Sequence, residues 1–323
     1  MLPRRHVLQL AGAVGFAGMP RFAWGQAYPS RPVRWIVPFP PGGGTDLLAR
    51  LIGQWLSERL GQQFVIDNRP GGGSNIGTEA AAHASPDGYT LLLVASVHTI
   101  NASLYDKLGF DFIRDIAPVA GSMRALNVMV VNPSVPAKSV PEFIAYARAN
   151  PGKINMASAG IGTSQHVAGE LFKFMAHIDM VHVPYRGTAP ALTDLLSGRV
   201  QVLFMSPASA IEYIKAGTLR GLAVTSATRS QALPDLPAVG DFLPGFEASL
   251  MYGLGAPKNT PSEIVDKLNK AVNAGLADPS VKARLADLDG TVLGGSPADF
   301  GKLIAEETEK WRRVIRLANI KPE

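Results

Sequence analysis

The chain has 323 residues, contains no cysteine, and carries 31 basic against 26 acidic residues. The missing cysteines exclude disulfides and thiolate metal sites, and no run of Lys and Arg of the kind that follows a phosphate backbone occurs, so nucleic acid is not an expected partner. A chain of this length predicts about two domains with ample core.

The first 27 residues have the features of an export signal. The pair Arg4-Arg5 gives a basic start, residues 7–17 are apolar, and small residues at 25–27 offer a cleavage site, so we expect the mature chain to begin near Tyr28. The apolar run is about half of the ~20 residues that a membrane span needs. The two arginines also fit a twin-arginine signal, and the sequence leaves Sec and twin-arginine export open. Removing the signal lowers the net charge from +5 to +2, and we expect a soluble periplasmic protein.

Short β-branched runs alternate with amphipathic helices along the first part of the mature chain, which predicts parallel α/β structure. Thr45 or Asp46 is expected to cap the first helix, and Gly61 to end it. The strands and helices predicted in this part are, in chain order, a strand over 33–38, a helix from Thr45 or Asp46 to Gly61, a strand over 64–67, a helix over 76–84 and a central strand over 90–94.

The character of the chain changes near residues 125–135, where a strand over 126–131 is followed by two prolines. We expect a crossing into a second lobe here and a return at the strand over 248–255. The prediction is a first lobe of 28–125 plus 246–323 and a second lobe of 126–245. The other strands predicted in the second lobe are 154–157, 181–183, 200–204 and 221–225, and its predicted helices are 140–149, 163–175, 190–196 and 207–215. After the return to the first lobe, helices are predicted over 261–276, 279–288 and 297–317.

Three predicted strands run into a glycine-rich loop and then into a helix start, at 40–46, 70–75 and 160–164. Such a loop leaves backbone N–H groups unpaired at the positive end of a helix, which favours a bound anion. Because ligands of open parallel sheets bind beyond the carboxyl ends of the strands, the three loops are expected to face one cleft. The alternative is that they are tight turns that merely need glycine.

Motifs for catalysis, cofactors or metals are incomplete in this chain. No Gly-Lys-Ser/Thr follows the first loop, and Ile76 occupies the third glycine position of a dinucleotide fingerprint. Neither a G-x-S-x-G elbow nor an H-E-x-x-H motif is present. The histidines of segment 177–182 are placed where a helix ends and a strand begins, which points them apart. We therefore predict no catalytic residue, no cofactor and no metal.

Two cationic side chains are candidates for contacts with an anion. His166 lies in the first turn of a predicted helix, and the alternative is a capping or surface histidine. Arg186 follows a strand end and suits a carboxylate because guanidinium offers paired donors in one plane. The alternative for Arg186 is a salt bridge with Asp194 that fixes the loop.

Five segments in combination resemble a known family. The segments are Tyr-Pro-Ser-Arg-Pro at 28–32, Pro-Phe-Pro-Pro-Gly-Gly-Gly-Thr-Asp at 38–46, the Asn-Arg-Pro-Gly-Gly-Gly stretch at 68–77, and the motifs at 85–90 and 183–187. They resemble the Bug receptors, the TctC-like extracytoplasmic solute-binding proteins of tripartite tricarboxylate transporters, over essentially the whole mature chain. The resemblance implies a two-lobed (type II, Venus-flytrap) periplasmic-binding-protein fold, joined by two crossing strands. It also implies a periplasmic monomer that captures a small carboxylate, is not an enzyme, and meets its membrane transporter subunits transiently.

The resemblance also implies the ligand contacts. In the family a carboxylate is held largely by backbone groups and bridging waters of the first lobe, and the second lobe closes over it. The residues that this implies here are Phe39, Pro41, Gly43, Gly44, Asp46, Asn75 and Ser96 in the first lobe, and Ser158, Gly160, Gly162, Thr163, His166, Tyr185, Arg186 and Gly187 in the second.

Several questions stay open at this point. Many members of the family have alanine where this chain has Gly72, and that departure gives no indication of the ligand. Neutral or aromatic ligands are alternatives to a carboxylate. The alternatives to a transport receptor are an exported α/β enzyme that acts on a small carboxylate and a sensing receptor that feeds a signalling partner.

Overall fold

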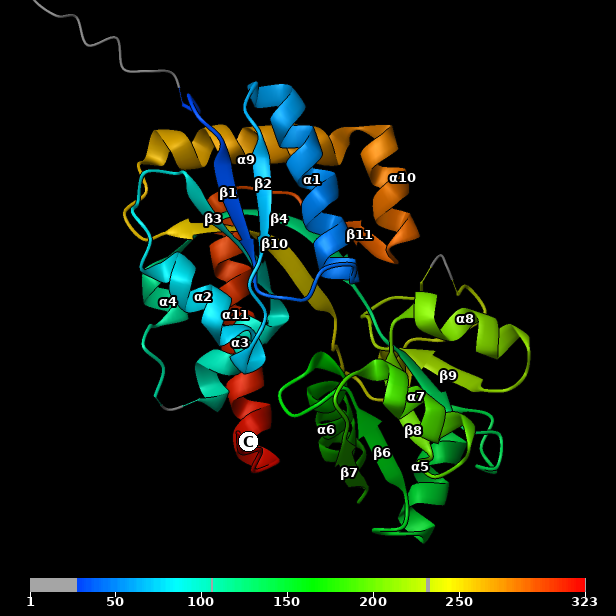
Figure 1. Cartoon of the computed structure of the whole chain (residues 1–323). Helices are drawn as coiled ribbons and strands as arrows, with labels where there is room; N and C mark the ends of the chain where they lie inside the picture. Colours follow the sequence, from blue (N-terminus) through cyan, green and yellow to red (C-terminus); the bar gives the residue numbers. More distant parts are fainter. Residues whose placement is uncertain (1–27, 106, 231–232, 323) are drawn as a thin grey trace, which may run out of the picture.

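The structure is a computed structural model that describes residues 28–105, 107–230 and 233–322; the predicted export signal at 1–27 lies outside the described residues. The chain forms two α/β lobes (Figure 1). Lobe 1 is built on a six-stranded sheet of order β11-β4-β10-β3-β1-β2, and lobe 2 on a five-stranded sheet of order β7-β6-β8-β5-β9. The predicted arrangement of two α/β lobes joined by two crossings is confirmed.

The elements of lobe 1 come from both ends of the chain. Its strands are β1 (Val33–Val37), β2 (Phe64–Asn68), β3 (Thr90–Ala95), β4 (Ile116–Ala125), β10 (Leu250–Pro257) and β11 (Gly290–Val292). Its helices are α1 (Gly44–Leu60), the 3-10 turn η1 (Gly72–Ser74), α2 (Asn75–Ala82), α3 (Ser96–Leu104), α4 (Phe112–Asp115), α9 (Ser262–Ala277), α10 (Pro279–Asp287) and α11 (Pro297–Leu317).

Lobe 2 takes the middle of the chain. Its strands are β5 (Val128–Val131), β6 (Asn155–Ser158), β7 (Val181–Pro184), β8 (Val202–Met205) and β9 (Arg220–Val224). Its helices are α5 (Val140–Ala149), α6 (Ser164–Ala176), α7 (Thr188–Leu196), α8 (Pro207–Lys215) and the 3-10 turn η2 (Val239–Asp241). The chain crosses between the lobes twice, from β4 to β5 and from β9 to β10. We propose that the lobe boundaries lie where the sequence predicts: at 125/126, where β4 ends, and at 245/246, within the segment that joins β9 to β10.

Strand direction brings the loops of each lobe to one edge. In lobe 1, β1 pairs in parallel with β2 and with β3, so the carboxyl ends of these three neighbours lie together. In lobe 2, β6 pairs in parallel with β7 and with β8. The crossing strands are antiparallel to these groups: β10 to β3, and β5 to β8. Each lobe therefore collects its strand-to-helix loops at the end where the chain crosses to the other lobe.

Strand β3 divides the core of lobe 1 into two layers, as a central parallel strand covered on both faces should. Leu91 and Leu93 pack with the apolar faces of α1, α9 and α10. Leu92 and Val94 point to the other face and pack with α2, α4 and α11. All six residues of β3 are buried.

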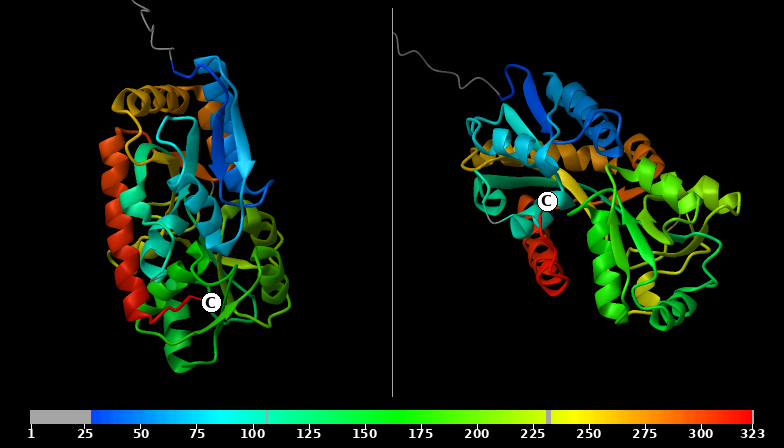
Figure 2. Two further views of the ribbon diagram at one scale, coloured as in Figure 1. Left: turned by 60° about the vertical axis from the view of Figure 1, so that its left-hand side comes forward. Right: turned by 60° about the horizontal axis from the view of Figure 1, so that its bottom comes forward.

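Helix α11 joins the two lobes by packing. Trp311, Val314 and Ile315 in its last turns belong to the same buried cluster as Val167 and Phe172 of α6. Figure 2 shows α11, in red, running along lobe 1 and reaching lobe 2 with its carboxyl end. The hydrophobic core of lobe 2 thus continues onto a helix of lobe 1, in addition to the two crossings.

Two local predictions are wrong. Neither Thr45 nor Asp46 caps α1, because the N-cap is Gly43 and Asp46 lies inside the first turn. The segment 126–131 is not one strand, since β4 ends at Ala125 and β5 begins at Val128. Strands β4 and β11 and helices α3 and α4 are not predicted from the sequence. Gly61 does end α1, in the left-handed conformation with φ +74°, as predicted.

Candidate ligand-binding site

The residues implied for lobe 1 lie on the loops, or in the first turns of the helices, that follow β1, β2 and β3, which are neighbours in the sheet. Those implied for lobe 2 lie at the ends of β6 and β7, on the loops that follow, and in the first turn of α6. Figure 1 shows the β1–α1 loop at the edge of lobe 1 that faces the β6–α6 and β7–α7 loops. The structure therefore groups the candidate residues into one set per lobe at the border between the lobes.

The β1–α1 loop is held from inside by the carboxylate of Asp46, which is only 2 % exposed. It accepts the Gly42 N–H at 2.9 Å, Arg50 Nε at 2.8 Å and Asn68 Nδ2 at 3.0 Å. Burial raises the pKa of Asp46, but the hydrogen bonds from Arg50, Gly42 and Asn68 outweigh burial and hold the pKa below its usual value. Asp46 is therefore an ionised support of the loop, with its oxygens already occupied.

The start of α1 presents main-chain donors without partners. The N–H groups of Gly43, Gly44 and Thr45 donate to nothing in the part of the chain that the structure describes. Gly44 is exposed, and no atom lies within 4 Å of the position that a Cβ would take there. Pro41, also exposed, has no N–H. Three unpaired donors at a helix N-terminus form a site that favours an anion.

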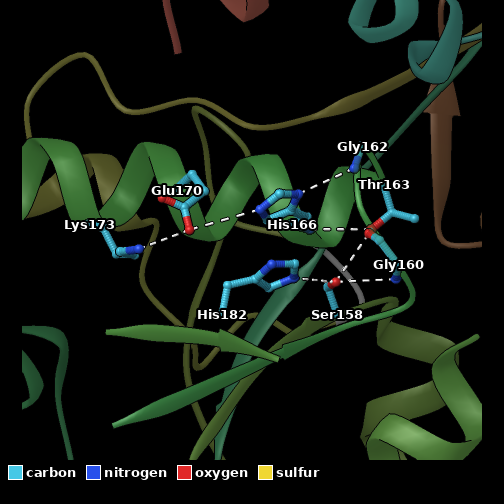
Figure 3. Close-up of polar contacts among 8 residues, drawn as sticks. All are labelled: Ser158, Gly160, Gly162, Thr163, His166, Glu170, Lys173 and His182. Atoms are coloured by element: carbon cyan, nitrogen blue, oxygen red, sulfur yellow. Dashed lines mark hydrogen bonds and ion pairs between the residues drawn. The ribbon is translucent and has the colours of Figure 1, made fainter. Parts of the chain in front are cut away.

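The β6–α6 loop uses most of its own N–H groups internally (Figure 3). Gly160 N–H donates to Ser158 Oγ at 3.1 Å, and Gly162 N–H donates to His166 Nδ1 at 3.2 Å. Thr163 is the N-cap of α6, because its Oγ1 accepts the N–H of His166. The N–H groups that remain unpaired among the described residues are those of Ile161, Ser164 and Gln165.

His166 supports this loop as a neutral ring. It stacks on His182 with ring centroids 3.7 Å apart and an angle of 9° between the planes (Figure 3). Burial, with the neighbouring His182 and Lys173, lowers the pKa of His166 to about 3, and burial lowers the pKa of His182 to about 4. A neutral His166 keeps Nδ1 free of a proton, as the bond from Gly162 requires. Ser158, fully buried, lies 2.7 Å from His182 Nε2.

Arg186 in the β7–α7 loop has no partner among the described residues, and its side chain is exposed. The alternative salt bridge with Asp194 is contradicted. Asp194 is instead occupied by the Tyr185 hydroxyl at 2.7 Å and by Arg199 at 3.0 Å. Gly187 is the N-cap of α7 with φ +118°, and nothing fills the space beside it. A free guanidinium next to an open helix start suits an anionic ligand.

Three amide side chains tie the loops together, and the sequence analysis predicted none of them. Asn68 donates to Phe39 O and Asp46 Oδ1, which links the end of β2 to the β1–α1 loop. Asn101 donates to Gly73 O and Asn75 Oδ1, which links α3 to the β2–α2 loop. Gln165 bonds to Ala159 N and Thr188 Oγ1, which links the β6–α6 and β7–α7 loops. Only Asn68 lies in a motif that could have signalled its role.

The loops of the two lobes meet at α3. A Cβ on Gly162 would lie 2.7 Å from Leu104 Cδ2, so the β6–α6 loop rests directly on this helix of lobe 1. Gly162 also has φ +75°, which favours glycine. Ser96 begins α3, and its buried Oγ accepts the N–H of Met251 at 2.8 Å. Helix α3 therefore carries candidate loops of both lobes.

One cavity of the structure does not coincide with the candidate ligand-binding site. A cavity of about 420 Å³ is lined by Arg124, Glu247 and Asp289 among others and contains none of the implied ligand contacts. The described residues hold no group of three His, Cys, Asp or Glu side chains suited to a metal ion. Within the same ranges, no helix has the length and apolar character needed to cross a membrane.

Comparisons with known proteins agree on one family. The model of the tripartite tricarboxylate transporter family receptor, TctC, matches residues 48–320. Protein BugT of Bordetella pertussis is 35 % identical over 306 residues, covering 94 % of this chain and 94 % of its own length. The chain therefore belongs to the tripartite tricarboxylate transporter receptor family, as the resemblance to Bug receptors predicts.

Two solved structures extend this comparison. R. palustris Rpa4515, solved with adipate, has a TM-score of 0.81 and 38 % identity, covering 92 % of this chain and all of that one. MatC (Rpa3494) from Rhodopseudomonas palustris, with bound malate, has a TM-score of 0.77 and 32 % identity, covering 89 % of this chain and all of that one. At this level of similarity the whole described chain, with its loops at the lobe border, has the fold of these receptors and belongs to their family.

Proposed function

We propose that this protein is a periplasmic receptor that captures a small organic carboxylate between its lobes for a tripartite tricarboxylate transporter. One observation carries the proposal: at the starts of α1 in lobe 1 and α6 in lobe 2, main-chain N–H groups have no partner among the residues that the structure describes. Membership of the receptor family supports it. So do the adipate and malate held by the two related proteins.

The proposed role is capture without chemistry. Asp46, Ser158 and His166 have the side chains that could act as acid, base or nucleophile, and each is occupied by groups of its own loop. A receptor must also release its cargo. Neutral hydrogen bonds of about 1 kcal/mol each allow release more readily than a buried ion pair does. Closure of the lobes would then shift an existing equilibrium between open and closed forms.

The proposal includes the setting in which the receptor works. We propose that residues 1–27 direct export by the Sec or twin-arginine route, that the mature chain is a monomer, and that it meets the membrane subunits only transiently. The fifteen residues implied by the resemblance remain the proposed binding set. Within it, the donors of Gly43, Gly44 and Arg186 have no partner in the described ranges of the chain, whereas Asp46, Ser158 and His166 support the loops.

Carboxylates should raise the melting temperature of the mature protein. A ligand that binds only the folded state at 100 times its Kd adds about 2.7 kcal/mol, which corresponds to several degrees. The measurement is thermal unfolding with adipate, malate and a panel of mono- and tricarboxylates, against the matched diamides as neutral controls. If no carboxylate shifts the midpoint and the diamides do, the anion assignment is wrong. Mass spectrometry of the incubated ligand would show a product if the protein were an enzyme.

Replacing Arg186 by Ala should weaken carboxylate binding without weakening the fold. Loss of one charge-assisted hydrogen bond predicts an affinity about 10 to 100 times lower. The free energy of unfolding should change by less than about 0.5 kcal/mol, because the side chain is exposed and has no partner in the described part of the chain. Calorimetric titration measures the affinity, with Arg59→Ala, another exposed arginine, as the charge-matched control. Equal affinities for both variants would remove Arg186 from the site.

A further inference from the structure

Asn101 is a buried amide of α3, 4 % exposed, at the point where loops of both lobes rest on that helix. Its Nδ2 lies 2.7 Å from Gly73 O and 3.0 Å from Asn75 Oδ1. Its Oδ1 lies 3.8 Å from the position that a Cβ on Gly162 would take. The two ends of one amide therefore face the β2–α2 loop of lobe 1 and the β6–α6 loop of lobe 2.

The orientation of this amide follows from the chemistry of its neighbours. A main-chain carbonyl can only accept, so Asn101 must turn its NH₂ group toward Gly73. The atom of Asn75 that faces the same NH₂ group must then be an acceptor, its side-chain oxygen. Consequently the NH₂ group of Asn75 is turned away, and it has no partner in the part of the chain that the structure describes.

We propose that Asn101 is a positioning residue for ligand binding: it fixes the amide of Asn75 so that the binding site sees a hydrogen-bond donor there and not an acceptor. Asn75 is half-buried and belongs to the set implied for ligand contact. A donor at this position favours a carboxylate oxygen, whereas an acceptor would repel it. The inference rests on the proposed function for its effect on affinity, but not for the orientation of the Asn75 amide.

The decisive variant is Asn101→Asp, because it keeps the size of the side chain and replaces the donor by an acceptor at neutral pH. Asn75 should then turn its NH₂ group toward the introduced carboxylate and present its carbonyl oxygen to the ligand. The affinity for adipate, measured by titration calorimetry, should fall about tenfold or more. Protonating the introduced carboxyl at lower pH restores a donor, so part of the affinity should return in this variant alone.

Two further variants distinguish a positioning role of Asn101 from an effect on the stability of the fold. Asn75→Ala removes the side chain through which Asn101 acts. Adding Asn101→Asp to this variant should therefore lower the affinity for adipate by less than about a further twofold. If the two substitutions lower the binding free energy for adipate additively, the proposal is wrong. Asn269→Asp is the matched control, because Asn269 is also a buried amide that donates to two main-chain carbonyls, of Val119 and Gly295, in lobe 1. It should weaken the fold and leave the affinity for adipate unchanged.

A measurement without ligand makes the inference independent of the proposed function. The side-chain NH₂ signals of Asn75 in ¹⁵N NMR spectra, assigned by their absence in Asn75→Ala, should shift in Asn101→Asp. Unchanged signals would overturn the proposal even if carboxylates bind. If the wild-type protein binds no carboxylate, the proposed function fails, while these signals still decide how the amide is oriented. Shifted signals with an unchanged affinity for adipate would also overturn the positioning role.

Discussion

Acidification from pH 7 to pH 4 is expected to lower the free energy of unfolding by several kcal/mol, because His98 and His166 are buried and His182 is half-buried, all three without charge. Burial lowers the pKa of His98 to about 4, and it lowers those of His166 and His182 to about 3 and about 4. In the unfolded chain these groups titrate near pH 6.5. Between the two values the unfolded state binds more protons, so stability is complete above about pH 6.5 and is lost as the pH falls toward the folded-state values.

The expected loss of unfolding free energy can be calculated for His98, whose ring is buried. A shift of about 2.5 pH units corresponds to roughly 3 kcal/mol for this group alone. His98→Asn keeps an acceptor for the Ala95 N–H and removes the titration, so urea unfolding at pH 7, 5.5 and 4 should show a shallower acid dependence. His83→Gln, at an exposed histidine, is the control and should leave that dependence unchanged. A stability that is flat from pH 7 to pH 4 would contradict the neutral, buried state of these rings.

Replacing Asp46 by Ala is expected to have the largest single effect on both stability and binding. The substitution leaves the Gly42 N–H without its acceptor, removes one of the two acceptors of Asn68 Nδ2, and breaks the ion pair of Arg50. Losing hydrogen bonds to a buried charge predicts about 2–4 kcal/mol less stability. The β1–α1 loop, which carries the free donors of α1, would no longer be held, so carboxylate affinity should fall at least about tenfold.

The control for Asp46 is a carboxylate with similar local bonds but far from the proposed site. Asp278 caps α10 by accepting the N–H groups of Ser280 and Val281, and it is half-buried. Asp278→Ala should cost about 1 kcal/mol, as the loss of an N-cap does, and should leave carboxylate affinity unchanged. Urea unfolding and calorimetric titration of both variants decide the matter. If Asp46→Ala binds as tightly as Asp278→Ala, the loop does not depend on Asp46.

The parts of the fold with strong local signals could be predicted from the sequence. The bounds of α5, α8 and α11 agree with the predicted 140–149, 207–215 and 297–317, because periodicity and proline or serine at the helix start mark them locally. Strand β4 was missed since its sequence contains proline, glycine and serine. It is a strand because it pairs with β10 and β11, and those partners lie more than a hundred residues away.

The loops of the candidate site can be predicted from the sequence better than the contacts of its side chains. The loops at 40–46 and 160–164 join a strand to a helix, as predicted, because their glycine motif is local. His182 was weighed only as part of a metal cluster, whereas it stacks on His166 from a different element. Asn101 reaches Gly73 across 28 positions in the chain, and no local pattern marks such a bond. Which residues touch the ligand stays a prediction.

The central claim is that main-chain N–H groups from both lobes hold a carboxylate. A crystal structure of the mature protein with adipate, or with the carboxylate that raises its melting temperature most, tests this directly. The carboxylate oxygens should lie about 2.7–3.2 Å from the N–H groups of Gly43, Gly44 or Thr45, or reach them through one water. When lobe 2 closes, the N–H groups at the start of α6 should contact the ligand from the other side. A ligand held in the cavity beside Arg124, or anchored elsewhere with these donors still unpaired, would contradict the account.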